Sequence, residues 1–428
     1  MLIEFRVENF RSLHHEQTLS MVASGVDRHR DTHVREGVAD GFDVLNTALV
    51  YGANASGKTN VVAALDVLKQ LVTPTVLRNY PGDPLGALDP FRLDPLARSA
   101  PTTFEVIFVE KGVRYRYGTV ISRERVEEEW LYSYPVRERL LFQRFGDDVE
   151  FGPTLRTGPA KSVRQLVPNR PRSLFLSLLA EFQIDEIAPV AGWFIGRLNV
   201  LIAAGFPDTY TRKLMHEDRG ARQFVSDIIR YANTGIDLVT VKRVIETVDV
   251  PETVARIMRE MGQPAPPPEF EHVSVTFERA DGEGEAVQFE EDDESMGTMR
   301  LFALAGPLYE VLRDGLVMVV DELDTSLHPD LMRVFVGLFH NPGMNPHGAQ
   351  LIATTHDTSM LDREVIRPDN VWLTEKDRRG ATTLYPLTDF PVRSDAAFAS
   401  LYHAGRVGGL PALAFSLLDD IDDYAATE

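Results

Sequence analysis

The sequence contains no cysteine. The chain therefore forms no disulfide bond, offers no thiolate to a zinc ion and has no cysteine nucleophile. It also has no apolar run near the roughly 20 residues that a membrane-spanning helix needs. The N-terminus, Met1–Arg6, contains an acidic residue and no long apolar segment, so it does not resemble a signal peptide. Together these absences predict a cytoplasmic protein with no membrane partner.

Positive charge is scarce, because 44 Lys and Arg residues stand against 64 Asp and Glu residues, for a formal net charge of −20. A surface this acidic does not coat nucleic acid nonspecifically, so any such contact needs a local basic patch. Residues 151–180 lack acids and carry five basic residues: Arg156, Lys161, Arg164, Arg170 and Arg172. This segment is either a phosphate-backbone contact or a solvated loop that pairs with acids elsewhere. The candidate nucleic-acid contacts are thus 156–172 and the helical insertion described below.

The most specific motif is Gly52-Ala53-Asn54-Ala55-Ser56-Gly57-Lys58-Thr59, which fits the phosphate-binding loop G-x-x-x-x-G-K-[ST]. An apolar run of strand length, residues 45–51, precedes it, and apolar residues recur at helical spacing after it. This strand–loop–helix context disfavours a chance glycine-rich turn. Backbone N–H groups and the helix N-terminus would hold phosphate oxygens. Lys58 would reach the β- and γ-phosphates, and Thr59 would offer its hydroxyl to Mg²⁺.

A second motif is the apolar run 316–320 that ends in Asp321 and Glu322. A buried parallel strand places such carboxylates at its C-terminal edge, where ligands bind in sheets of this kind. Asp321 would hold Mg²⁺, and Glu322 would polarise the attacking water. The alternative is a structural strand with a capping acid, which the phosphate loop in the same chain disfavours.

Two further features predict contacts to the γ-phosphate of the same nucleotide. Residues 351–356 form another apolar strand that ends in His356, one helix (about 329–341) after the acids, which predicts a histidine that senses the γ-phosphate. Ser295 and Gly297 precede a helical run with leucines at 301, 304 and 308. Ser295 is either a helix N-cap or, with Gly297, a contact to a γ-phosphate across a dimer interface.

The motifs and the periodicity predict an α/β protein with three regions: 1–165, an N-terminal nucleotide-binding lobe with the phosphate loop and an antiparallel β lobe; 166–268, a helical insertion; and 269–428, a C-terminal nucleotide-binding lobe. The β lobe is a hairpin at 102–121 followed by short strands through 126–151. Residues 25–43 and 74–101 are expected to be loops. Residues 173–262 are expected to be helical, with helices near Leu178, Phe224 and Val254, followed by a proline-rich connector at 263–268.

These motifs, in this order, resemble the ABC-type ATPase heads of the structural-maintenance-of-chromosomes (SMC), RecF and OLD-like proteins. The matching residues are Asn9-Phe10-Arg11-Ser12, the phosphate loop, Ser295-Met296-Gly297-Thr298, Asp321-Glu322-Leu323-Asp324-Thr325-Ser326-Leu327-His328-Pro329, and Thr354-Thr355-His356. The layout is similar to ATPases of bacterial phage-defence loci, of the RloA, AbiL, Septu and PARIS types, and Tyr402–Pro411 also resembles that group. OLD-type nucleases carry a Toprim domain after the ATPase, but only residues 357–428 follow His356, and Asp420–Asp422 is expected to be a solvated tail.

The resemblance implies that two heads of a homodimer enclose two ATP molecules with Mg²⁺. Thr59 and Asp321 would bind the metal, and Lys58, Glu322 and His356 would be catalytic, with Glu322 as the general base. The nucleotide would be bound by Arg11, Gly52, Asn54, Ala55, Ser56, Gly57, Lys58, Thr59 and Asn60 of one protomer and by Ser295 and Gly297 of the other. The signature sequence of this chain, Glu294-Ser295-Met296-Gly297-Thr298, departs from the transporter form Leu-Ser-Gly-Gly-Gln, and Gln143 is the candidate for the water-positioning glutamine.

Four functions compete. The first is an ATP-hydrolysing subunit of an anti-phage defence complex that regulates a separate effector, such as a nuclease or a toxin. The second is a RecF-like DNA repair or recombination ATPase, which the basic segment favours and the net charge disfavours. A transporter ATPase is disfavoured by the signature, and a non-catalytic scaffold is disfavoured by the intact Glu322.

Overall fold

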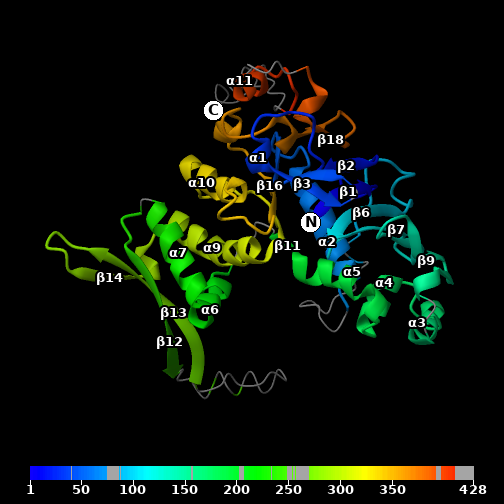
Figure 1. The fold of residues 1–428 in the computed structure, drawn as a ribbon, viewed down its shortest axis with the longest axis horizontal. Coiled ribbons are helices and arrows are strands. Elements are labelled where there is room, and N and C mark those ends of the chain that lie inside the picture. Colours follow the sequence, from blue (N-terminus) through cyan, green and yellow to red (C-terminus); the bar gives the residue numbers. More distant parts are fainter. Residues whose placement is uncertain are drawn as a thin grey trace, which may run out of the picture. The chain divides into compact units, whose positions relative to one another are not determined.

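The computed structural model describes residues 1–39, 41–74, 86, 88–155, 158–201, 207–232, 234–247, 253, 256, 269–391 and 397–409. They group into two compact units, whose elements are labelled in Figure 1. The first unit draws on Met1–Ala203, Gly315–Asp324 and Met332–Glu428, and the second on Ala204–Asp314 and Thr325–Leu331.

A six-stranded sheet forms the centre of the first unit, in the order β11-β15-β16-β5-β17-β18. All neighbouring strands run parallel except β18, which pairs antiparallel with β17 at the edge. Every residue of β5 is buried, as expected for a central parallel strand covered on both faces. The strands are β5 (Thr47–Gly52), β11 (Leu198–Leu201), β15 (Val317–Val320), β16 (Gln350–Thr354), β17 (Val371–Lys376) and β18 (Thr382–Pro386).

The second sheet of this unit is an antiparallel lobe in the order β10-β9-β8-β7-β6-β1-β2. The predicted alternation is confirmed, because Phe104, Val106 and Phe108 are buried while the residues between them are less so. A turn at Lys111 and Gly112, both with positive φ, closes the predicted hairpin. The strands are β1 (Leu2–Glu8), β2 (Gln17–Ser20), β6 (Thr102–Glu110), β7 (Val113–Ile121), β8 (Val126–Tyr134), β9 (Arg139–Phe145) and β10 (Asp148–Phe151).

Helix α2 (Lys58–Val72) joins the two sheets into one hydrophobic core. Its apolar residues, among them Val61 and Leu65, belong to the same cluster as Phe5 of β1 and Val317 of β15. Two short strands, β3 (Val34–Ala39) and β4 (Phe42–Leu45), pair with each other. The other helices are α1 (Arg30–His33), α3 (Gly158–Arg164), α4 (Phe175–Glu181), α5 (Ala188–Gly192), α10 (Pro329–His340), of which Met332 onward belongs to this unit, and α11 (Phe398–His403).

The described residues of the second unit form helices and a three-stranded antiparallel sheet, β12-β13-β14. Helix α9 contains Pro307, which has no N–H to donate to the Ala303 carbonyl one turn earlier. Thr211 Oγ1 donates to that carbonyl instead, at 2.9 Å, so the helix continues through the proline. The elements are α6 (Thr209–Glu217), α7 (Arg219–Tyr231), α9 (Met296–Asp314), β12 (Leu238–Thr247), β13 (Glu269–Ala280) and β14 (Ala286–Glu290).

The predicted fold class, α/β with a phosphate loop on a parallel sheet, an antiparallel lobe and added helices, is confirmed. The expectation that 173–262 is helical throughout is wrong, because β11 returns the chain to the core sheet and β12 pairs with β13. Short apolar runs such as 198–201 cannot be assigned to helix or strand from periodicity alone.

Two predicted loops also contain regular structure. Residues 25–43 include α1, β3 and the first residues of β4, and the basic segment includes α3 and part of α4. The predicted helix near Val254, the connector 263–268, Arg156, the end of the motif at 410–411 and the tail Asp420–Asp422 lie outside the described residues.

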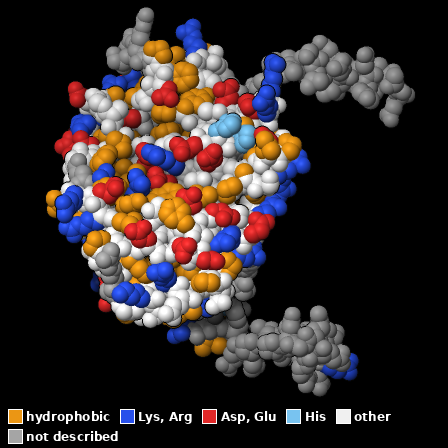
Figure 2. Space-filling view, turned by 90° about the vertical axis from the view of Figure 1, so that its right-hand side faces the viewer, with side chains coloured by type: hydrophobic (Ala, Val, Ile, Leu, Met, Phe, Trp, Pro, Cys, Tyr) orange, Lys and Arg blue, Asp and Glu red, His pale blue; other side chains and the backbone are white. Residues whose placement is uncertain are grey.

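Surface charge and apolar length bear on possible partners. On the face shown in Figure 2, Lys and Arg side chains are interspersed with Asp and Glu and form no continuous basic surface. Within the described part of the chain, no helix has the length and apolar character that crossing a membrane requires.

Candidate nucleotide-binding site

The phosphate loop connects β5 to α2 and depends on two glycines. Gly52 has φ +154° and Gly57 has φ +112°, which are conformations that other residues rarely adopt. A Cβ on Gly52 would lie 2.3 Å from Thr374 Oγ1 and 2.6 Å from the Thr374 carbonyl oxygen, and a Cβ on Gly57 would lie 2.2 Å from Thr382 Oγ1. Only glycine therefore lets the loop pass this close to β17 and β18.

Hydroxyl groups from outside the motif hold the loop in place. Ser56 Oγ and Thr374 Oγ1 are 2.6 Å apart and share a hydrogen bond, and Thr382 Oγ1 donates to the Ser56 carbonyl at 2.7 Å. Ser12 Oγ accepts a hydrogen bond from Asn60 Nδ2 at 2.6 Å and shares a second hydrogen bond with Thr382 Oγ1 at 2.7 Å. The Asn-Phe-Arg-Ser motif thus contributes Ser12 to the loop, a contact that sequence reasoning missed.

The Lys58 ammonium group folds back over the loop. Its Nζ donates to the carbonyls of Gly52 at 2.8 Å and Ala53 at 3.1 Å. Burial lowers the pKa of Lys58 to about 8, although the carboxylates of Asp324, Asp321 and Glu322 act in the opposite direction. The amine remains mostly charged at neutral pH and is available to phosphate oxygens that would replace the two carbonyls.

Asp321 and Thr59 approach each other as a pair of oxygen ligands would. Thr59 Oγ1 donates to Asp321 Oδ1 at 3.3 Å, and Thr354 Oγ1 donates to the same oxygen at 2.6 Å. Hydroxyl and carboxylate oxygens are the donors that Mg²⁺ prefers. No cluster of three or more His, Asp or Glu side chains suited to a metal occurs in the described residues. The pair therefore fits a Mg²⁺ whose other ligands are phosphate oxygens and water.

Glu322 follows Asp321 in a strained conformation. Its φ is +50°, and its N–H donates to Thr354 Oγ1 at 2.7 Å. A left-handed backbone at a non-glycine residue costs of order 1–3 kcal/mol and is concentrated at functional sites. The strained turn places the Glu322 carboxylate in the pocket that the phosphate loop borders.

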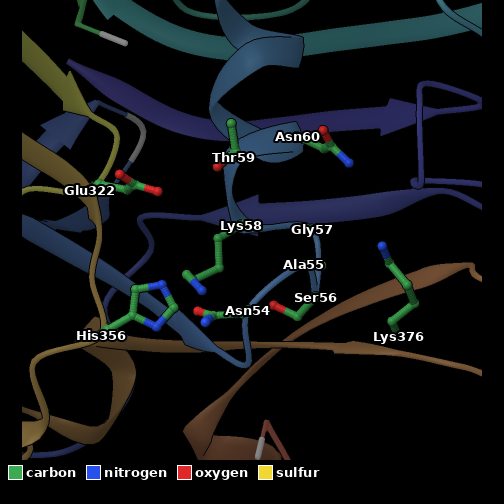
Figure 3. A pocket seen from close by; sticks show the side chains of 10 residues that line it. All are labelled: Asn54, Ala55, Ser56, Gly57, Lys58, Thr59, Asn60, Glu322, His356 and Lys376. Atoms are coloured by element: carbon green, nitrogen blue, oxygen red, sulfur yellow. The ribbon is translucent and has the colours of Figure 1, made fainter. Parts of the chain in front are cut away.

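His356 lies just beyond β16, on the same side of the pocket as Glu322 and Lys58 (Figure 3). The backbone N–H of His356 donates to Asp324 Oδ2 at 3.0 Å. Desolvation, followed by the charge of Lys58, lowers the pKa of His356, so the ring is neutral at pH 7. A neutral imidazole can donate one hydrogen bond to a phosphate oxygen or to water.

These residues surround one open pocket of about 520 Å³ (Figure 3). Its lining comprises Asn54, Ala55, Ser56, Gly57, Lys58, Thr59, Asn60, Glu322, His356 and Lys376. All except Lys376 were predicted. Lys376 ends β17, and a basic residue at the end of a short apolar strand was the only available signal.

Not every predicted residue lies at this pocket. Arg11 is exposed, and its guanidinium carbon lies 5.3 Å from the centre of the Phe10 ring rather than at the pocket lining. Gln143, the glutamine candidate, lies on β9 in the antiparallel lobe. Ser295 and Gly297 belong to the second unit, where Ser295 Oγ accepts the Thr298 N–H at 3.1 Å, as an N-cap does.

A phosphate loop, a strand followed by two acids and a strand followed by His356 meet at one edge of the six-stranded sheet, beside an antiparallel lobe, and this arrangement defines a P-loop fold. A family model described as "AAA domain, putative AbiEii toxin, Type IV TA system" matches residues 48–362, and the chain belongs to this family. No curated protein matches the chain.

Solved structures similar to this chain include heads of SMC proteins. An SMC head bound to the C-winged helix domain of ScpA is 12% identical with a TM-score of 0.45, and the match covers 90% of this chain and 97% of that chain. The SMC head domain from Thermotoga maritima is 12% identical with a TM-score of 0.42, covering 90% and 98%. An SMC head with an extended coiled coil, bound to the C-terminal domain of ScpA from Pyrococcus furiosus, is 11% identical with a TM-score of 0.42, covering 90% and 96%.

Proposed function

We propose that the chain binds Mg²⁺–ATP at this pocket and hydrolyses it to ADP and phosphate. The observation that carries the proposal is the position of the Glu322 carboxylate, which shares one pocket with the phosphate loop and with His356. Phosphoryl transfer to water needs positioning and charge stabilisation more than covalent chemistry. Lys58 and the loop N–H groups would hold the β- and γ-phosphates, Glu322 would orient and deprotonate water, and His356 would donate to the γ-phosphate.

Magnesium would be held by Thr59 and Asp321. The metal would neutralise charge that develops on the bridging phosphate oxygens. Binding would replace the Thr59–Asp321 hydrogen bond, while the bond from Thr354 would keep the carboxylate oriented.

A second protomer would complete the site with Ser295 and Gly297. Ser295 is exposed at the N-terminus of the 19-residue helix α9, where backbone N–H groups favour an anion. Beside it, Met296 is an exposed apolar side chain (82%), which suits a surface that becomes covered. A Cβ on Gly297 would lie 2.8 Å from the Ser326 carbonyl oxygen, so this position excludes side chains.

In the cell we propose a cytoplasmic, homodimeric ATPase that regulates a separate effector, such as a nuclease or toxin, in anti-phage defence. The motif resemblance supports this role, as does a family whose description refers to a toxin of a toxin–antitoxin system. The second candidate is a RecF-like DNA ATPase, favoured by the exposed Lys161 and Arg164 on α3. Against it, the net charge is −20 and Arg170 pairs with Glu181 at 3.3 Å.

The decisive experiment compares wild type with Glu322→Gln. We expect phosphate release to fall by about 10²- to 10⁴-fold, the range for loss of a general base. The variant should still bind ATP, and ATP–Mg²⁺ should shift it from monomer to dimer, which a measurement of mass in solution detects. Glu150→Gln changes an exposed carboxylate on β10 and should hydrolyse like wild type. Equal hydrolysis by Glu322→Gln and wild type would show that another residue is the base.

A further inference from the structure

Lys376 lines the nucleotide pocket, although neither the phosphate loop nor the acid strand contains it. It is the last residue of β17 and is exposed. Within the described part of the chain, no carboxylate forms an ion pair with its ammonium group. The Lys376 ammonium group therefore lies beside a phosphate loop in a protein with a net charge of −20, where it is available to bind an anionic nucleotide.

The strand geometry fixes the direction of this side chain. Side chains two residues apart on a strand point to the same face, about 7 Å from each other. Thr374 contacts Ser56 of the loop, so Lys376 lies on the loop side of β17, one step further along. Its partner across the β17–β18 ladder is Thr382, whose hydroxyl donates to the Ser56 carbonyl. The strand that carries Lys376 and the strand paired with it are therefore both hydrogen-bonded to the loop next to this position.

The pocket has two ends. Figure 3 shows Lys58, Glu322 and His356 at one end and Lys376 at the other, with the phosphate loop between them. If Glu322 activates water, the γ-phosphate must lie at the Glu322 end. The remainder of the nucleotide then extends past Gly57 and Asn60 toward Lys376.

We propose that Lys376 binds the α-phosphate at the nucleoside end of the bound nucleotide, opposite Lys58. This inference rests on the proposed nucleotide binding and adds a residue to it. An ammonium group is a point charge without base preference, so the contact is made equally to ATP, ADP and GTP. The α-phosphate is unchanged during hydrolysis, so Lys376 contributes uniform binding, which raises affinity and leaves kcat unaltered.

The test measures Kd for ATP, ADP and GTP, and kcat at saturating ATP, in wild type and in Lys376→Ala, Lys376→Arg and Lys111→Ala. Lys111 is an exposed lysine in the β6–β7 turn and serves as the matched control. We expect Lys376→Ala to raise all three Kd values by a similar factor, about tenfold, which corresponds to one charge-assisted contact. We expect kcat to stay within about twofold, Lys376→Arg to recover most of the affinity, and Lys111→Ala to match wild type.

Three results would overturn the inference while leaving the proposed function intact. Wild type and Lys376→Ala could bind nucleotides equally well. The loss could be confined to either ATP or GTP, which would indicate a contact to the base. The variant could lower kcat with Kd unchanged, which would place the lysine at the reacting phosphate. Failure of wild type to bind any nucleotide would instead overturn the proposed function, and the inference with it.

Discussion

Thr354 Oγ1 donates a 2.6 Å hydrogen bond to Oδ1 of Asp321, the acid that ends the neighbouring strand. The same oxygen accepts the N–H of Glu322 at 2.7 Å. One buried hydroxyl on β16 therefore orients both the proposed metal ligand and the proposed base, which follow β15. Thr354 also precedes His356 by two residues, so β16 leads to the proposed histidine contact as well.

Replacing that hydroxyl by a methyl group should reduce the rate of ATP hydrolysis more than it reduces the stability of the fold. Thr354→Val keeps the shape of the side chain but leaves Asp321 Oδ1 and the Glu322 N–H without this partner. We expect the free energy of unfolding to fall by about 1–3 kcal/mol, as for unsatisfied buried polar groups, and phosphate release to fall at least about tenfold. Urea denaturation and a phosphate-release assay measure the two effects.

Thr354→Ser is the matched control, because it restores the hydroxyl and removes only a methyl group. Its hydrolysis should lie close to that of wild type. If Thr354→Val hydrolyses ATP as well as Thr354→Ser does, the hydroxyl does not position Asp321 or Glu322 for catalysis.

The close contact between Gly52 and β17 leads to a second prediction. Gly52→Ala forces a Cβ to within 2.6 Å of the Thr374 backbone oxygen, in addition to its strained φ. We expect a loss of about 2–4 kcal/mol in the free energy of unfolding, the sum of backbone strain and overpacking, together with weakened nucleotide binding.

Gly112→Ala isolates the backbone contribution. Gly112 has φ +75°, but no atom lies within 4 Å of the position that its Cβ would take. This variant should lose only about 1 kcal/mol. Equal losses in urea denaturation for the two variants would mean that the loop moves aside and that its contact with Thr374 is not tight.

Sequence reasoning could predict most residues that line the candidate pocket because the motifs are local. The phosphate loop and Asp321-Glu322 each lie within a few consecutive residues, and a parallel sheet brings strand ends together at one edge. Lys376 and Thr382 could not be found this way. Their roles depend on the β17–β18 register, which follows from pairing between segments far apart in the chain.

The same limit explains the misassigned elements. Residues 198–201 form a strand only because β15, from the other end of the chain, pairs with them. Helix α9 was found from its leucines even though Pro307 interrupts it, and the compensating hydroxyl of Thr211 has no signature in the local sequence. Long-range partners, rather than propensity, decided both cases.

Buried histidines predict the behaviour of the fold in acid. His33 stacks on His340 with ring centres 3.5 Å apart, and its Nε2 donates to the Val365 carbonyl at 3.0 Å. Burial lowers the pKa of His33 to about 4, and burial also lowers the pKa of His340. A histidine in the unfolded chain has a pKa near 6.5. The contribution of these two histidines to the free energy of unfolding is therefore fully present above that pH and is lost as the pH falls toward 4.

Urea denaturation at pH 7.5, 6 and 5 measures this loss. We expect about 1 kcal/mol per pH unit for each histidine within that window. His33→Gln removes one titrating group, so its stability should depend less steeply on pH, even if it is less stable at every pH. Identical slopes for wild type and the variant would mean that His33 becomes protonated in the folded state without penalty.

The proposed composite site makes a prediction about mixtures of inactive variants. Lys58→Ala destroys the phosphate-loop half of each site, and Ser295→Arg destroys the half that the partner supplies. Each variant alone should be inactive, because every site in its homodimer lacks one half. In a mixed dimer, the intact loop of the Ser295→Arg chain meets the intact Ser295 of the Lys58→Ala chain, so one of the two sites is whole.

Random exchange makes half of the dimers mixed, so an equimolar mixture should recover about one quarter of wild-type phosphate release, as twofold symmetry with independent sites requires. Recovery would also show that neither substitution unfolds the chain. The double variant Lys58→Ala/Ser295→Arg, mixed with wild type, is the control, because its mixed dimers contain one defective half in each site and should add no activity. If the two single variants remain inactive together, although mass measurements show that they form mixed dimers, Ser295 does not act on the nucleotide of its partner.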